Sequence, residues 1–195
     1  MKIQNKLFYT SLVILTFSLS ACSDTKETAS HTKTTQTQEI QNPQGHWQVK
    51  GDYLSTANKH DIKTDLAQLT LISQAYNRKV LKMHEDVKTA GNNPEKIKQI
   101  LVETNTIRDY FKQKYTELHL KSSEVQNIRT LIIDNFMISE QLYTLSMQAD
   151  FSLNAPSEEF KQLSKRSMDL QQKIGTELEG LNAKYTKQPL SKSLS

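Results

Sequence analysis

The apolar residues in the C-terminal two-thirds of this 195-residue chain recur in steps of three and four, which restricts the fold more than any other feature. On an α-helix with 3.6 residues per turn, such steps place the side chains on one face. The pattern therefore predicts long amphipathic helices that each bury one face. The first of them is defined by Ile62, Leu66, Leu69, Ile72, Tyr76, Val80, Met83 and Val87.

Turn residues divide the periodic region into four helices. Gly91 can adopt a left-handed backbone and end the first helix, and Asn93 can cap a second helix that begins at Pro94. The sequence from Ser123 to Gln126 has the Ser-x-x-Gln pattern of a capping box, which predicts the start of a third helix there. All four prolines lie outside the predicted helices, as expected for Pro43, Pro94, Pro156 and Pro189 if the helices are continuous.

The composition supports an all-α fold. Five glycines and four prolines are too few turn residues for a β-sandwich of this length. Short links between long helices favour antiparallel neighbours, so residues 47–185 are predicted to form an up-down four-helix bundle. The alternative is a pair of helical hairpins that complete a bundle only by dimerising. Residues 186–195 are predicted to be a disordered tail.

The N-terminal segment has the order of parts found in an export signal. Lys2 and Lys6 provide a basic start, and the uncharged, mostly apolar run from Leu7 to Ser20 follows. Its 14 residues are too short for a membrane span, which needs about 20 apolar residues, but suit the core of a signal peptide. The alternatives are an uncleaved anchor or a plain secretory signal.

The residues Leu19-Ser20-Ala21-Cys22 resemble the lipobox of bacterial lipoproteins, and Cys22 is the only cysteine in the chain. The resemblance implies that residues 1–21 are removed and that Cys22 carries a diacylglyceryl thioether and an N-acyl chain such as palmitate. It also implies a location, because in this family an Asp directly after the cysteine tends to retain the protein at the inner membrane. Ser23 stands at that position and Asp24 follows, so we expect the outer membrane, facing the periplasm.

The segment after the cysteine is too polar to fold alone. Residues 22–46 contain few apolar side chains and are predicted to be a flexible tether that spans about 25 to 30 Å. Residues 47–54 are more apolar and are expected to fold back on the bundle. The alternative is that they form an exposed linear recognition segment. Without Lys2 and Lys6 the mature chain has 23 basic and 21 acidic side chains, and a net charge of +2 gives no reason to expect nucleic acid as a partner.

We expect no enzymatic activity, cofactor or metal. The chain has neither the Glu-x-x-His repeat of di-iron bundles nor a His-x-x-x-His pair, and a single cysteine excludes Cys-x-x-Cys motifs. There is also no glycine-rich phosphate loop and no Gly-x-Ser-x-Gly motif. Antiparallel packing would bring His60 and His119 to the same end of the bundle, but no carboxylate or thiol is placed to complete a metal site.

Two glycines, Gly175 and Gly180, fall inside the predicted fourth helix. Each costs about 1 kcal/mol relative to alanine in a helix interior. They either allow the close approach of another helix or lie on a tolerant outer surface, and the sequence does not distinguish these alternatives.

The third predicted helix, residues 124–150, is apolar over an unusually wide arc. Besides its main seam it has a second stripe, roughly 90 to 120° away around the helix axis. Two bundle neighbours cover only one stripe, so the second either binds an envelope protein or another copy of the chain, or is covered within the monomer by residues 47–54. The predicted partner-binding residues are Val125, Arg129, Ile132, Phe136, Glu140, Tyr143 and Met147.

These features predict a lipid-anchored envelope protein whose helical domain is a non-catalytic interaction or accessory module in the periplasm. The alternative is a helical bundle that binds a small ligand or a metal and has a sensing, storage or catalytic role. Neither the partner nor the biological process follows from the sequence.

Overall fold

A computed structural model describes residues 48, 51–91, 93–152 and 155–186. The four helices are α1 (Lys59–Ala90), α2 (Pro94–Thr116), α3 (Ser123–Ser146) and α4 (Glu158–Leu181). A 3₁₀ turn, η1 (Gly51–Tyr53), precedes α1, and a π-helical turn, η2 (Asn182–Thr186), follows α4. The prediction of an all-α bundle is therefore confirmed. The predicted signal peptide, Cys22, the tether, Trp47 and residues 187–195 lie outside the described residues.

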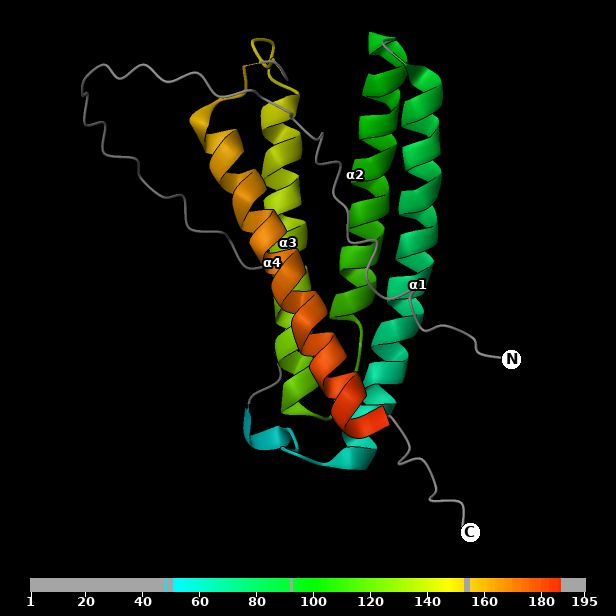
Figure 1. The fold of residues 1–195 in the computed structure, drawn as a ribbon, viewed down its shortest axis with the longest axis vertical. Coiled ribbons are helices and arrows are strands. Elements are labelled where there is room, and N and C mark those ends of the chain that lie inside the picture. Colours follow the sequence, from blue (N-terminus) through cyan, green and yellow to red (C-terminus); the bar gives the residue numbers. More distant parts are fainter. Residues whose placement is uncertain (1–47, 49–50, 92, 153–154, 187–195) are drawn as a thin grey trace, which may run out of the picture.

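Consecutive helices run antiparallel and form two hairpins, α1 with α2 and α3 with α4 (Figure 1). The hairpins are joined through contacts of α3 with both α1 and α2, and η2 packs against α1. Their axes diverge towards the end that holds the α1–α2 turn. We call that end the distal end. We call the opposite end, which holds the α2–α3 link, the strap end, because residues 51–57 cross it as a strap. The 32 residues of α1 rise about 48 Å between the two ends.

The turn between α1 and α2 has the predicted chemistry. Gly91 has a positive φ of 56°, which a residue with a side chain rarely adopts. The Asn93 side chain accepts a hydrogen bond from the backbone N–H of Lys96 at 3.0 Å, and Pro94 occupies the first turn of α2. The prediction of the cap at Asn93 is therefore confirmed.

The predicted capping box at the start of α3 is wrong. The N-cap is Ser122 rather than Ser123, and its side chain makes no capping hydrogen bond. The Ser122 hydroxyl instead donates to Oδ2 of Asp65 at 2.6 Å, and the Gln126 carbonyl oxygen accepts from Arg129. The N-cap Ser122 is thus occupied by a tertiary partner on α1, and Gln126 is occupied by an arginine three residues further along α3.

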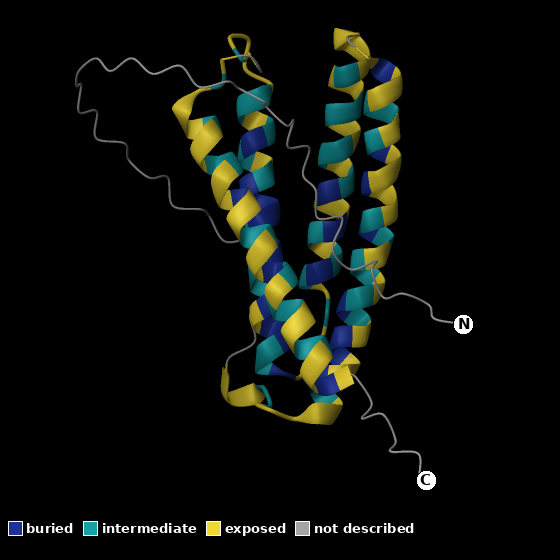
Figure 2. Cartoon of the chain, viewed as in Figure 1, coloured by how far each residue is buried: buried dark blue, intermediate teal, exposed yellow. Residues whose placement is uncertain are grey.

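The core is centred on α3, which packs on α4 along one side and on α1 and α2 along the other (Figure 2). Aromatic rings fill the middle of the second interface. The Phe136 ring lies 5.2 Å from the Tyr76 ring and 5.7 Å from the Tyr115 ring, and Tyr76 in turn lies 5.2 Å from Phe111. The two contacts of the Tyr76 ring are edge-on, a geometry that stabilises a core beyond the area that it buries. The wide apolar arc of α3 therefore reflects its central position.

A buried carboxylate fixes the α2–α3 link to α1. Asp65 is fully buried, and its Oδ2 accepts hydrogen bonds from the backbone N–H groups of Lys121 at 2.9 Å and Ser122 at 2.7 Å. Lys121 and Ser122 belong to the link between α2 and α3, where no turn of helix supplies acceptors for their backbone N–H groups. A buried backbone donor without an acceptor would destabilise the fold, so Asp65 acts as a tertiary cap.

A buried guanidinium complements this carboxylate on the other side of the link. Arg129 is fully buried and donates to the backbone carbonyl oxygens of Tyr115 and Leu118, at the C-terminal end of α2. Burial lowers the pKa of Arg129 to about 10, and the negative charge of Asp65 opposes that shift. The two groups of opposite charge thus fasten the strap end of the bundle from within.

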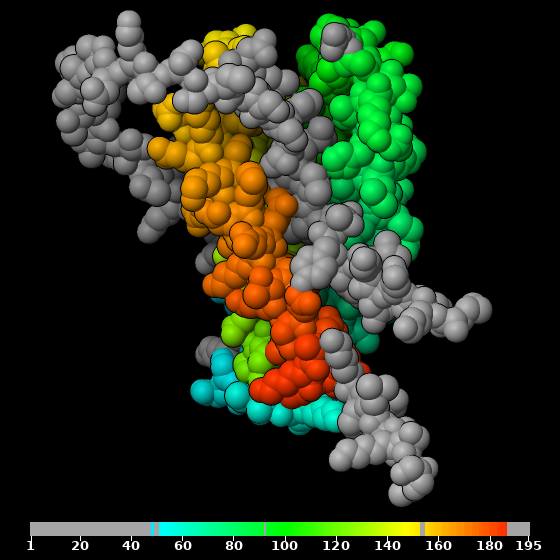
Figure 3. All heavy atoms as spheres, in the orientation of Figure 1, coloured from blue at the N-terminus to red at the C-terminus, as the bar shows by residue number. Residues whose placement is uncertain are grey.

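Residues 51–57, which we call the strap, run along the α2–α3 link. Ser55 forms a parallel β-bridge with Ser122, and the strap atoms form part of the molecular surface beside η2 (Figure 3). We expected residues 47–54 to fold back on the bundle. The side chain of Leu54 is half-buried, but Tyr53 is 79% exposed, so the expectation is wrong for this tyrosine.

Candidate interaction surface

The structure divides the predicted partner-binding stripe of α3 into a buried and an accessible half. Val125, Arg129, Ile132 and Phe136 are at most 2% exposed. The prediction that these four residues bind a partner at the surface is therefore wrong. The physical reason is that α1 and α2 both pack on this side of α3. The described part of the expected cover, residues 51–54, belongs to the strap at the end of the bundle.

The other three predicted residues lie on the distal half of α3 and remain accessible. Glu140 is exposed, Tyr143 is half-buried, and Met147 is 38% exposed at the C-terminal end of the helix. They follow one another at steps of three and four residues, so they share one face of the helix. This face borders α2, and we call the shared region of the two helices the α2–α3 surface.

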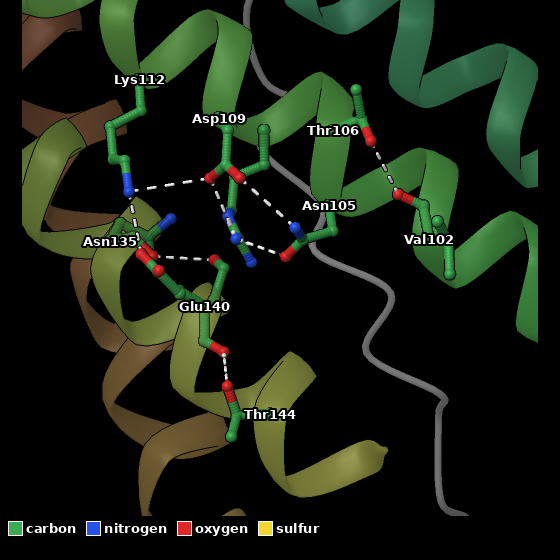
Figure 4. A network of polar contacts seen from close by, with 10 residues as sticks. Val102, Asn105, Thr106, Asp109, Lys112, Asn135, Glu140 and Thr144 are labelled. Carbon is green, nitrogen blue, oxygen red and sulfur yellow. Dashed lines mark hydrogen bonds and ion pairs between the residues drawn. The ribbon is translucent and has the colours of Figure 1, made fainter.

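A lysine of α2 connects the two helices at this surface. Lys112 Nζ lies 2.8 Å from Oε2 of Glu140 on α3 and 3.6 Å from Oδ1 of Asp109 on its own helix (Figure 4). Asn105 donates from Nδ2 to Oδ2 of Asp109 at 3.3 Å. Figure 4 shows these side chains converging between the helices. The Asp109 and Glu140 side chains are about half exposed, so two carboxylates border the surface above a less exposed lysine.

A nearly buried arginine lies beneath the carboxylates. Arg108 donates from Nη2 to Oδ1 of Asp109 at 3.0 Å and also to the Asn105 side chain. Its guanidinium carbon lies 6.0 Å from the centre of the Tyr143 ring, at the outer limit of a cation–π contact. Arg108 Nε is buried and has no hydrogen-bond acceptor among the described residues. The α2–α3 surface therefore has an aromatic ring, half-exposed carboxylates and a cation with one unused donor.

The α2 half of this surface was not predicted from the sequence. Arg108 and Lys112 are four residues apart, so they share a face of α2. That spacing was visible in the sequence as a basic pair next to Asp109. Nothing in the sequence set the register of α2 against α3, which is what brings Lys112 to Glu140.

The structure gives no support to the weak metal hypothesis at the histidines. His60 and His119 are both exposed near the strap end. Within the described ranges, no group of three or more His, Cys, Asp or Glu side chains is arranged to hold a metal ion.

The helical bundle and the lipobox-like N-terminus together define a class, an all-helical domain of a bacterial lipoprotein. In the described part of the chain, none of the helices combines the length and the apolar character that a membrane span requires. Residues 63–186 match the family described as "Uncharacterised lipoprotein PM1805", and the chain belongs to this family. The match extends from the first turns of α1 to the end of η2.

No curated protein matches the chain, and no solved structure matches it either. Family membership supports the interpretation of the N-terminus as a lipoprotein signal and identifies a lipid-anchored envelope protein.

Proposed function

We propose that this protein is a non-catalytic interaction module, held by its N-terminal lipid at the outer membrane and docked on another envelope protein in the periplasm. The observation that carries the proposal is the α2–α3 surface, where Tyr143 and Met147 lie next to the half-exposed carboxylates of Asp109 and Glu140. Ser23 after the lipidated cysteine supports the outer membrane as the location.

The residue types at this surface match those that dominate protein interfaces. Tyrosine and arginine are enriched among residues whose truncation costs the most binding energy, and methionine adapts to the shape of a partner. Arg108 supports the Tyr143 ring from below, which reduces the conformational freedom that the ring would lose on binding. The carboxylates of Asp109 and Glu140 would orient a partner that presents a basic side chain.

The chain offers matched controls for a test of this surface. Acylated protein would be purified from solubilised envelopes, and co-purifying proteins would be identified and quantified. Tyr143→Ala and Met147→Ser are compared with Tyr110→Ala and Met168→Ser, which alter exposed residues of the same types on α2 and α4. A hot-spot loss of about 2 kcal/mol would lower recovery of a specific partner by more than tenfold.

The expected result is a loss of one partner with the α3 variants only. Recovery of the same proteins in the same amounts with all four variants would contradict the proposal. Circular dichroism of each variant confirms that a loss of partner is not a loss of helix.

A second candidate function, binding of a small ligand within the bundle, is favoured by the unused Nε donor of Arg108. A ligand with an acceptor atom would satisfy that donor after a local opening between the hairpins. Native mass spectrometry and elemental analysis of protein purified from envelopes test this candidate. A bound small molecule or metal that is lost in Arg108→Lys would favour it over the interaction module.

A further inference from the structure

The strap end of the bundle carries the most exposed large apolar side chain of the described residues. Tyr53 on η1 is 79% exposed, compared with 55% for Tyr110 on α2. An exposed tyrosine alone needs no explanation. Its position does, because Tyr53 lies on the segment through which the chain leaves the bundle towards Cys22. Among the described residues, Tyr53 is therefore the exposed aromatic residue nearest in sequence to Cys22.

The strap holds Tyr53 in a fixed place rather than on a loose end. Ser55 donates from its backbone N–H to the Lys121 carbonyl oxygen at 2.8 Å, and its own carbonyl oxygen accepts from the backbone N–H of Ser123 at 2.9 Å. Two residues further on, the backbone N–H of Ala57 donates to Oε1 of Glu124 at 2.7 Å. These bonds connect the strap to the start of α3.

The hydrogen bond from Ala57 holds the carboxylate of Glu124, an acidic side chain at the strap end of the bundle. Partial burial acts to raise the pKa of Glu124, but the hydrogen bonds from Ala57 N–H and from the Ser123 hydroxyl, with the charge of Lys184, hold it below its ordinary value. Glu124 therefore stays ionised at neutral pH, and its charge is directed into the strap.

Basic side chains flank the strap at the surface. Lys59 at the start of α1 and Lys121 in the α2–α3 link are both exposed, and neither forms an ion pair among the described residues. Acidic residues lie close to both in sequence, with Asp61 two residues after Lys59 and with Glu117 and Glu124 within four residues of Lys121. The local charge is thus mixed, and two exposed lysines that form no ion pair among the described residues lie at the same end of the bundle as Tyr53.

We propose that the strap end is a bilayer-contact surface, with Tyr53 at the level of the lipid headgroups and with Lys59 and Lys121 against anionic headgroups. The occupant is the membrane that holds the lipid of Cys22. Tyrosine is enriched at membrane interfaces because its ring is apolar and its hydroxyl is polar. Lysines near an anionic surface add attraction that salt screens.

The lipid anchor keeps the bundle close to the bilayer, so that even a weak contact between the strap end and the membrane is populated. Only 28 residues separate Cys22 from Gly51, so the strap end cannot move further from the membrane than the roughly 100 Å of that segment when fully extended. The tethered bundle therefore meets the bilayer at a high effective concentration. End-on contact would direct the distal end, with the α2–α3 surface, away from the membrane. The contact depends on the lipid anchor and not on the proposed partner.

Depth-dependent quenching in vesicles tests the proposal with the full acylated protein. A dye is attached at Gly51→Cys, where an added Cβ meets nothing within 4 Å, or at Glu95→Cys on the first turn of α2 at the distal end. The sulfur of Cys22 is blocked by its lipid, so each variant has one free thiol. The vesicles contain phosphatidylethanolamine, phosphatidylglycerol and a brominated phospholipid as the quencher.

The expected result is strong quenching at position 51 and little at position 95. Tyr53→Ser should lower the quenching at position 51 to the level at position 95, and the matched control Tyr110→Ser should not. Replacing Lys59 and Lys121 by Gln should lower the ratio of docked to undocked protein by about fivefold for each lysine, and added salt should act in the same direction. The controls Lys82→Gln and Lys88→Gln lie on the distal half of α1.

Equal quenching at the two positions would overturn the proposal, and so would a Tyr53→Ser variant that behaves like Tyr110→Ser. Recovery of a partner by the α2–α3 surface is measured separately. A failure of membrane docking therefore leaves the proposed function untouched, and the reverse also holds.

Discussion

Replacement of the buried carboxylate Asp65 by alanine should destabilise the bundle more than any surface change. The substitution leaves the backbone N–H groups of Lys121 and Ser122 without their acceptor, and it removes the negative charge that compensates the buried Arg129. Removing one partner of a buried charge pair costs about 3 to 5 kcal/mol. A domain of this size has a total stability of about 5 to 15 kcal/mol, so the loss is a large fraction of it.

Thermal unfolding followed by circular dichroism measures this loss. The unfolding entropy is about 2.1 cal/mol/K per residue, which for roughly 135 residues gives a Tm decrease of about 10 to 18 °C. The matched control is Asp169→Ala. Its carboxylate lies 3.0 Å from Lys165 on the exposed face of α4, and such pairs contribute at most about 0.5 kcal/mol.

A double-mutant cycle separates the two causes. If charge compensation matters, Asp65→Ala should cost less in an Arg129→Met background, by about 1 kcal/mol or more. If the cost is the same in both backgrounds, the two backbone donors explain it alone. A decrease in Tm for Asp65→Ala no larger than that of Asp169→Ala would refute the tertiary cap itself.

Three further outcomes follow from the structure. Phe136→Ala should cost about 3 to 5 kcal/mol, because the ring is 1% exposed and contacts two tyrosines, and a urea titration that shows less than 1 kcal/mol would restore Phe136 as a surface residue. Gly175→Ala and Gly180→Ala should each raise stability by about 0.5 to 1 kcal/mol, since an added Cβ meets nothing within 4 Å at either site. A lower Tm would show that another molecule packs against these glycines. Burial raises the pKa of Asp134, opposed by the charge of Arg166, so ionisation costs native-state stability as the pH rises through that pKa. Asp134→Asn should therefore gain stability over the parent between pH 3 and pH 7, and a difference that does not change with pH would argue against this burial.

The helices and their ends were largely predictable because the information is local. Contacts between residues three and four apart produce the apolar stripes, and Asn93 caps α2 through an N–H only three residues away. The lipobox-like signal is equally local, since it is defined by a linear order of residue types. The same logic failed at Ser123, because the N-cap is Ser122, whose hydroxyl bonds to the distant Asp65 on α1.

The residues of α3 alone did not predict which parts of its surface are buried and which stay accessible. The width of the apolar arc indicated that more than one neighbour covers the helix, but not which one. Phe136 and Tyr143 belong to one stripe, yet the first is buried by aromatic rings of α1 and α2 and the second is half-buried at the distal end. Divergence of the two hairpins makes this difference, and divergence is a property of the packing.

The sequence by itself therefore determined the helical class, the helix ends set by local caps and the lipoprotein character of the N-terminus. Only the tertiary structure decided that Asp65 and Arg129 are core residues, although both are of types that are mostly exposed. The physical reason is that a charged side chain can be buried only where distant segments supply its hydrogen bonds and its counter-charge. For Asp65 the hydrogen bonds come from a link 56 residues further along the chain and the counter-charge comes from Arg129 on α3, and only folding brings both to α1.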